Sequence, residues 1–370
     1  MTGKPGILFP MRYPDDQGFV WRTVVDVRDR KAALLADRFS SFVAFPELTG
    51  RSAHDPQHMI PVELDAYDLT PGNRARLRDF VAQHRIAAIV YMSALPSTLD
   101  IGFLRSLGIT TINTEHDSFD HRVRDSLPRR AAKFVVRRVL KRQLHDLHIA
   151  NSESQGAWLQ SYAKIPPERM VVVPNGVDCE RFVPPARHVP AMQVVCAGQA
   201  RAEKRVELIL HAAAAILAKP RFAAARFTYV GAGAMLEEWQ ALAVRLGIAD
   251  RFAFAGAHSD LLPFYQSADL MVHAAERESF GLVLAEAMAC GLPVVASAAA
   301  GPSDIVADGE TGRLIALDDR DGFIAAIETY LGDPDLRRLH GAAGRERVVE
   351  LFSMERQVRD MAAAIRSALT

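Results

Sequence analysis

The chain has 370 residues, of which 49% are hydrophobic and 24% charged, and its formal net charge is zero. This length is too great for one compact core and predicts two domains of ordinary size. The balance of 44 basic and 44 acidic side chains argues against a protein that binds duplex nucleic acid, because such proteins carry a basic excess.

Short β-branched runs alternate with longer helical patterns through the first half of the chain. Strands are predicted at residues 7–9, 41–45, 86–91, 110–113, 147–150 and 170–173. Helices are predicted between them at residues 71–84, 99–107, 129–145 and 154–164. Alternation at this spacing predicts an α/β domain with a parallel sheet and helices on both faces.

A proline-rich segment with an Asn-Gly turn separates the two halves. It runs from Pro174 through Asn175-Gly176 to Pro190, a composition typical of a linker. We therefore predict one domain at residues 1–178 and a second at 179–350. An apolar stripe predicts a final helix at 351–370 that packs back on the first domain.

The second half repeats the alternation of strands and helices. Strands are predicted at residues 193–197, 226–230, 252–254, 270–273, 293–297 and 312–315, and helices at 205–218, 234–246, 261–267, 281–290 and 320–331. Ligands of open parallel sheets bind beyond the carboxyl ends of the strands. Two doubly wound domains that face each other would place the site in a cleft between them.

The stretch from Glu278 to Ser297 carries the clearest chemical signal. Two carboxylates, Glu278 and Glu286, bracket a Phe280-Gly281 turn that opens a predicted short helix. A helix N-terminus offers unpaired backbone N–H groups and a positive dipole end, which together suit a phosphate. Carboxylates beside it can accept hydrogen bonds from hydroxyl groups. A phosphate together with many hydroxyls describes a nucleotide sugar.

These motifs resemble the retaining glycosyltransferases of family GT4. The resemblance rests on the carboxylate pair, on Phe280-Gly281, on Gly231-Ala-Gly233, on the segment from Asp308 to Gly312 and on that from Val173 to Asp178. It implies the GT-B fold, in which two facing Rossmann-like doubly wound domains enclose a cleft and a helical tail follows. It also implies that a sugar moves from a UDP-sugar or GDP-sugar to an acceptor hydroxyl, in bacterial glycan, glycolipid or glycosylated-metabolite synthesis.

The resemblance assigns the donor half of the site. Glu278 is expected to contact donor-sugar hydroxyls or to stabilise charge near the anomeric carbon, and Glu286 to accept hydrogen bonds from the ribose. Lys204 is expected to neutralise the leaving diphosphate. The remaining donor-binding residues form the phosphate loops and amides: Gly198, Phe280, Gly281 and Leu282. The simpler alternatives are a capping acid for Glu278 and a solvated helix start for Lys204.

One cation of the family pattern is replaced here. Gln199 stands where the family often has an arginine after the first strand of the second domain. Arg201, two residues further on, is expected to reach the same phosphate, and Arg205 is an alternative. The segment Arg201-Ala-Glu-Lys204-Arg205 therefore keeps enough positive charge for a leaving diphosphate.

The acceptor half departs most from the family. His116 follows a predicted strand and is expected to be a catalytic residue that contacts the donor sugar, with Asp117 as an acceptor contact or base. The glycine pair that usually follows the first strand is absent. Arg12 and Gly18 lie in the loop that takes its place, and we expect them to contact the acceptor.

A basic amphipathic segment at residues 129–142 is the strongest charge cluster. Its apolar side suits the face of a sheet, so a covering helix is the favoured interpretation. Its basic side also allows peripheral contact with an anionic membrane or attraction of an acidic acceptor. No apolar run reaches membrane-spanning length and no secretory signal is visible, so we expect a cytoplasmic protein, with or without contact at the inner face of the membrane.

The sequence indicates neither a metal nor a cofactor. Its three cysteines have no metal or disulfide spacing, and no Asp-x-Asp motif lies beside a phosphate loop. We therefore expect a metal-independent enzyme whose only nucleotide is its substrate. Two alternatives stay open: a GT-B-fold nucleotide-sugar epimerase or sugar phosphorylase, and a non-catalytic module that binds nucleotide sugars or membranes.

Overall fold

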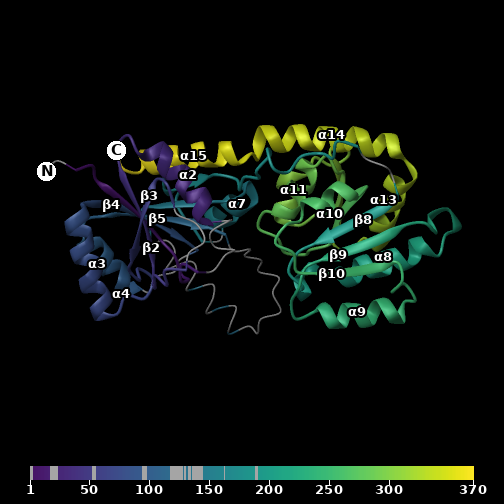
Figure 1. Ribbon diagram of the computed structural model, residues 1–370, viewed down its shortest axis with the longest axis horizontal. Helices are drawn as coiled ribbons and strands as arrows, with labels where there is room; N and C mark the ends of the chain where they lie inside the picture. The colour runs from purple at the N-terminus through teal and green to yellow at the C-terminus, as the bar shows by residue number, and fades with distance from the viewer. Residues whose placement is uncertain are drawn as a thin grey trace. The chain divides into compact units, whose positions relative to one another are not determined.

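The computed structural model describes residues 3–16, 24–51, 56–93, 98–116, 145–161, 163–187 and 191–370, together with residues 128, 131 and 135. The chain forms two compact units (Figure 1). The first combines Met1–Pro174 with Glu355–Thr370, and the second is Asn175–Met354. The boundary expected at residue 178 thus lies just inside the second unit.

A parallel sheet forms the centre of the first unit. Within the described residues its strands are β1 (Gly6–Pro10), β2 (Ser40–Phe45), β3 (Met59–Glu63), β4 (Ile86–Met92), β5 (Thr110–Glu115), β6 (Leu147–Ala150) and β7 (Met170–Val172). They lie in the order β3-β2-β1-β4-β5-β6-β7. The direction of winding reverses between β1 and β4, which defines the switch point where α/β sheets bind ligands.

In the described part of the first half, four helices accompany this sheet. They are α2 (Asp26–Leu35), α3 (Pro71–His84), α4 (Thr98–Ser106) and α7 (Glu153–Ser161). The final helix, α15 (Met354–Ser367), packs here as well and lies beside α2 (Figure 1). Its Met361, Ala362 and Ile365 share a buried cluster with Ile7 and Leu35. The apolar stripe of the tail is therefore covered by the first unit.

The sequence patterns do not predict α2 or β3. The buried face of α2 includes Arg28 and Lys31, so the helix lacks the apolar periodicity that would reveal it. β3 is the edge strand of the sheet, is mostly exposed and contains Pro61. A proline is tolerated at an edge because no neighbouring strand needs its missing N–H.

A second parallel sheet forms the centre of the second unit. Within this unit the strands are β8 (Gln193–Ala197), β9 (Arg226–Val230), β10 (Phe252–Gly256), β11 (Leu270–His273), β12 (Val294–Ser297) and β13 (Gly312–Ile315). The helices are α8 (Val206–Leu217), α9 (Leu236–Arg245), α10 (Leu262–Ser267), α11 (Leu282–Ala289), α12 (Ala300–Ile305), α13 (Arg320–Gly332) and α14 (Pro334–Leu351). The order β10-β9-β8-β11-β12-β13 places the switch point between β8 and β11.

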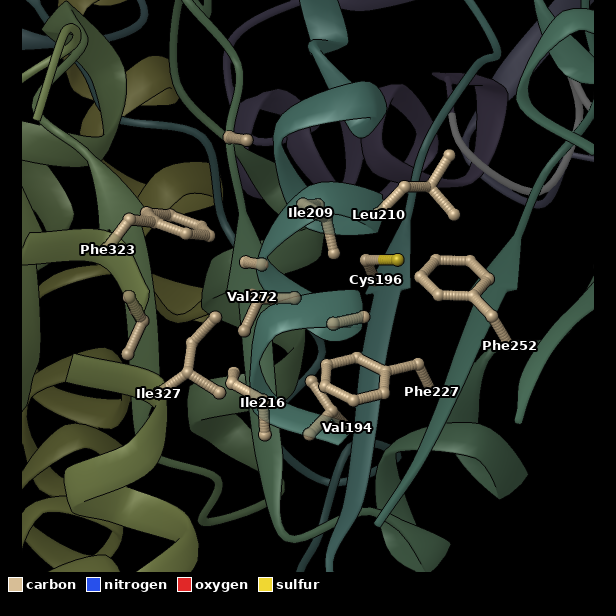
Figure 2. Packing of buried hydrophobic residues seen from close by; sticks show 14 of the residues in the cluster. Val194, Cys196, Ile209, Leu210, Ile216, Phe227, Phe252, Val272, Phe323 and Ile327 are labelled. Atoms are coloured by element: carbon tan, nitrogen blue, oxygen red, sulfur yellow. The ribbon is translucent and has the colours of Figure 1, made fainter. Parts of the chain in front are cut away.

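Apolar layers on the sheet hold these strand ends in place. Figure 2 shows Ile209 and Ile216 of α8 in one apolar cluster with Val194 of β8, Phe227 of β9 and Val272 of β11. Burying each large aliphatic or aromatic side chain stabilises the fold by about 1.5–3 kcal/mol. Among the described residues, none of the helices combines the length and the apolar character needed to cross a membrane.

Candidate active site

The site in the second unit begins at two glycine turns that follow adjacent strands. Gly198 follows β8 and Gly231 follows β9, with φ angles of 149° and 155° that favour glycine. A Cβ atom on Gly231 would lie 1.8 Å from the carbonyl oxygen of Gly198. The turns therefore pack backbone against backbone. The side chain of Lys204 passes over Gly198, with its Cε 3.8 Å from where a Cβ atom would stand.

Lys204 forms an ion pair with Glu278 across the switch point. Its Nζ donates to Oε2 of Glu278 over 2.6 Å, and the two side chains are only 19% and 17% exposed. Lys204 ends a short 3-10 turn after β8, whereas Glu278 lies in the loop after β11. The fold thus joins two predicted site residues that are far apart in sequence. The partly buried pair is stronger than a surface pair because water screens it less.

His273 is a third member of this arrangement. It is the last residue of β11, its side chain is buried, and its Nε2 lies 3.4 Å from the same Oε2 of Glu278. Burial by itself would raise the pKa of Glu278, but the His273 imidazole and the Lys204 ammonium outweigh it and lower the pKa to about 2. Glu278 is therefore a carboxylate at every physiological pH.

The N-terminus of α11 lies directly after Glu278. Gly281, with φ of 107°, is its N-cap, and the buried ring of Phe280 packs edge-on against Phe352. A Cβ atom on Gly301 would lie 2.4 Å from the carbonyl oxygen of Phe280, so α12 begins in close contact with this turn. The first amides of α11 precede its intrahelical acceptors and remain available to an anion.

Glu286 lies further along α11 and contacts a different helix. Its Oε2 accepts a hydrogen bond of 2.9 Å from the buried hydroxyl of Tyr265 on α10. Desolvation raises the pKa of Glu286 to about 7, although Tyr265 and Arg181 act in the opposite direction. The carboxyl group is half-buried, so it keeps a side that can face a ligand.

The remaining basic residues of this segment differ in their contacts. Arg205 donates to the carbonyl oxygen of Leu317 over 2.7 Å, so its guanidinium fixes the chain rather than the expected phosphate position. The side chain of Arg201 is 61% exposed, and its guanidinium lies 3.9 Å from the carboxylate of Glu203. Of these two candidate substitutes, Arg201 is therefore the more available for an arriving diphosphate.

The expected acceptor-side residues and His116 all belong to the first unit, and the structure describes two of them. His116 directly follows β5, and its backbone N–H donates to Oγ of Ser93 over 3.1 Å. Arg12 follows β1, donates to the carbonyl oxygen of Ser93 over 2.8 Å and stacks 4.7 Å from the ring centroid of Tyr67. Gly18 and Asp117 lie outside the described residues, as does the basic segment 129–142 except for its residues 131 and 135.

Sequence reasoning missed two residues of the candidate site in the second unit. His273 carried a usable signal, because a histidine at the carboxyl end of a buried strand points to the ligand edge of a sheet. Tyr265 carried none, since its contact with Glu286 depends on how α10 packs against α11. In each case the missing information was spatial proximity between segments.

Solved structures place this fold in a known class. A glycosyltransferase from Rickettsia africae superimposes with a TM-score of 0.80 at 16% identity, covering 100% of this chain and 99% of that one. The Anabaena protein HepE in complex with UDP gives a TM-score of 0.76 at 18% identity, covering 98% and 100%. The α/β GT-B fold expected from the sequence is confirmed.

Sequence relatives narrow the class further. A D-inositol 3-phosphate glycosyltransferase from Geodermatophilus obscurus is 36% identical over 60% of this chain and 53% of its own length. The lipopolysaccharide core biosynthesis mannosyltransferase LpcC of Rhizobium leguminosarum bv. viciae is 30% identical over 64% and 67%. The chain thus spans about half the length of the first relative.

The two halves of the chain each match a family description. Residues 30–181 match Glycosyltransferase Family 4, and residues 186–347 match Glycosyl transferases group 1. The chain belongs to the GT4 family of glycosyltransferases, as its motifs predict.

Proposed function

We propose that the protein is a retaining glycosyltransferase that uses a UDP-sugar or GDP-sugar and needs no metal ion. The observation that carries the proposal is the convergence of Lys204, Glu278 and the N-terminus of α11 at one switch point. Together they offer a cation and helix amides for a diphosphate beside a permanent carboxylate for sugar hydroxyls. The UDP bound by HepE in its solved complex supports a nucleotide ligand for this fold.

In the proposed reaction, the bond between the anomeric carbon and the diphosphate breaks as a bond to the acceptor hydroxyl forms. The diphosphate leaves with the electron pair and takes up the proton that the acceptor loses. Lys204, the first amides of α11 and Arg201 stabilise the negative charge that develops on the leaving group. Glu278 stabilises positive charge at the anomeric carbon, and attack on the face of departure retains the configuration.

A donor screen tests this proposal. UDP-sugars and GDP-sugars are incubated with and without candidate acceptors, in buffer that contains a chelator, and nucleotide release is measured. Acceptor-dependent release with an unchanged anomeric configuration in the product, read by proton NMR, is the expected result. Conversion of the donor without an acceptor would indicate an epimerase. Release that requires a divalent cation would contradict the metal-independent mechanism.

Glu286→Gln is expected to affect stability and nucleotide binding in opposite directions. The raised pKa means that Glu286 favours the folded state while protonated, and this contribution is lost as the pH rises from 4.5 through about 7. Glutamine has no charge to desolvate, so the variant should melt at the same or a higher temperature than wild type at pH 8. The difference should shrink at pH 5.

At pH 8, where Glu286 is ionised, the same variant should bind nucleoside diphosphate at least about tenfold more weakly, since a hydrogen bond to a charged group contributes about 1.5–3 kcal/mol. Thermal unfolding at both pH values and titration with UDP and GDP measure the two effects. A control, Glu237→Gln in the first turn of α9, should change neither. Unchanged nucleotide affinity in Glu286→Gln would leave this residue a structural role only.

A further inference from the structure

Three basic side chains and a histidine lie together at the switch point of the first unit. Arg12 follows β1, His116 follows β5, and Arg28 and Lys31 lie on α2, which succeeds β1. We call these four residues the switch-point cluster. Ser93, which follows β4, accepts hydrogen bonds from both Arg12 and His116. The adjacent strand ends β1, β4 and β5 therefore bring the cluster together.

Arg28 and Lys31 are buried although both are cations. Their relative exposures are 5% and 8%. The Nη1 atom of Arg28 lies 2.9 Å from the carbonyl oxygen of Pro10 and 2.7 Å from the sulfur of Met11, which fixes the guanidinium against the end of β1. Lys31 is three residues further along α2, so both side chains lie on the same face of the helix.

Lys31 has no counterion among the described residues. No hydrogen bond or ion pair to its ammonium exists within those ranges, and the strongest charge near it is Arg28, which repels it. Burial, and then Arg28, lower the pKa of Lys31 to about 7. A buried ammonium without a partner is costly, and a second cation beside it increases that cost.

Among the described residues, none of the acidic side chains on the surrounding elements pairs with the ammonium of Lys31. Asp15 accepts from Thr49, and Asp29 accepts from the backbone at residue 58. Glu115 accepts from the side chain of Asn113, and its charge also acts on His116, whose pKa it raises. At His116 the charges of Lys31 and Arg28 outweigh that of Glu115, so the net charge that acts within the cluster is positive.

His116, which directly follows β5, is the fourth member of the switch-point cluster. Part of its side chain is exposed, yet enough protein surrounds the imidazole for desolvation, followed by the charges of Lys31 and Arg28, to lower its pKa. A neutral imidazole can both donate and accept a hydrogen bond. A ligand at this edge would thus meet a neutral hydrogen-bonding group beside Arg28 and Lys31, and a bound anion would favour the charged form of Lys31.

We propose that the switch-point cluster binds an anionic group, a phosphate or a carboxylate, carried by the acceptor. That the anion belongs to an acceptor depends on the proposed glycosyl transfer. The anion site itself depends only on Arg28 and Lys31. The planar guanidinium and the compact ammonium together match an oxyanion. The acceptor hydroxyl would then lie near His116, and neutral sugars would be poor acceptors.

The first experiment measures anion binding without any transfer. Inorganic phosphate and malonate are titrated separately at constant ionic strength into wild type, Lys31→Met, Lys4→Met and Lys204→Ala, followed by calorimetry. Methionine keeps the length and apolar stem of Lys31 and removes only the buried charge, so Lys31→Met should fold. Lys4 is an exposed lysine of the same unit and serves as the matched control.

We expect Lys31→Met to bind the preferred anion at least about tenfold more weakly than wild type, the scale of a charge-assisted contact. Lys4→Met and Lys204→Ala should each keep this binding, which separates it from the diphosphate site of the second unit. Binding in Lys31→Met that equals wild type would overturn the proposal, as would loss of all binding in Lys204→Ala. The stronger of the two anions identifies the acceptor group.

The second experiment compares acceptors that differ only in their charge, such as a sugar and its phosphate ester. Wild type should prefer the anionic acceptor by about tenfold or more in kcat/KM, and Lys31→Met should lose this preference through KM. Equal use of both acceptors by wild type would contradict the proposal. If neither compound receives a sugar from any donor, the proposed glycosyl transfer is contradicted. The anion titration still shows separately whether the switch-point cluster binds an anion.

Discussion

Glu278→Gln is expected to lower turnover on the order of a hundredfold while nucleoside diphosphate binds as well as before, or more tightly. The carboxylate is held ionised beside Lys204 and His273, where it can oppose positive charge at the anomeric carbon. A neutral amide of the same shape cannot do so, and loss of one such electrostatic contact costs about 2.7–4 kcal/mol of activation free energy.

The effect on binding has the opposite sign because Lys204 is shared. In the free protein its ammonium is committed to Glu278 at 2.6 Å. A glutamine releases that ammonium, which can then interact fully with a diphosphate. Steady-state kinetics give the turnover, and titration with UDP and GDP gives the affinity.

Glu276→Gln is the matched control for this experiment, because Glu276 lies in the same loop but is exposed to solvent. It should leave both turnover and affinity near wild type. Thermal unfolding monitors the fold of each variant. The lowered pKa of Glu278 means that its stabilising contribution is present above pH 4.5 and is lost as the pH falls through about 2. A folded Glu278→Gln with wild-type turnover would refute the catalytic role.

The second unit was largely predictable from its sequence. Its strands are short β-branched runs that end at glycine turns, as at Ala197-Gly198, and parallel strands buried on both faces show this pattern clearly. The turn at Phe280-Gly281 was equally readable, because a glycine with φ of 107° opens a helix there. Local chemistry and tertiary structure agree in this unit, so the pattern was a reliable guide.

The first unit was less predictable because some of its buried positions carry charge. The alternation Asp26-Val-Arg28-Asp-Arg30 hides α2, since two cations, Arg28 and Lys31, occupy its inward face. The same cations form the switch-point cluster. If the anion site proposed above exists, the failure of the pattern has the same cause as the site, namely side chains placed for a ligand instead of for packing.

Contacts between distant segments could not be predicted from a single sequence. The 2.6 Å pair joins Lys204 to Glu278 and the 2.9 Å hydrogen bond joins Tyr265 to Glu286, although each residue by itself resembles an ordinary surface or core position. The pKa directions of both carboxylates follow from these partners and their burial. Sequence spacing indicates which residues belong to the candidate site. The packing around each carboxyl group then sets its pKa and therefore its charge.

Lys204→Ala is expected to lower turnover by about a hundredfold or more and also to weaken nucleoside diphosphate binding about tenfold. Its partly buried ammonium reaches across the switch point to the loop after β11, which leads directly into the N-terminus of α11. The leaving diphosphate gains charge as the glycosidic bond breaks, so the loss of Lys204 should affect the transition state more than the ground state.

Two comparisons isolate the role of this ammonium. Lys219→Ala removes an exposed lysine of the same unit. Its partner Glu328 still has an ion pair with Arg221 in this variant, so the kinetics should be unchanged. Arg201→Ala should reduce turnover less than Lys204→Ala, because the guanidinium is exposed and water screens it. A larger loss in Arg201→Ala would transfer the main charge-stabilising role to that residue. Because Glu278→Gln is expected to preserve nucleotide binding and Lys204→Ala to weaken it, the two variants together separate stabilisation of the sugar from stabilisation of the leaving group.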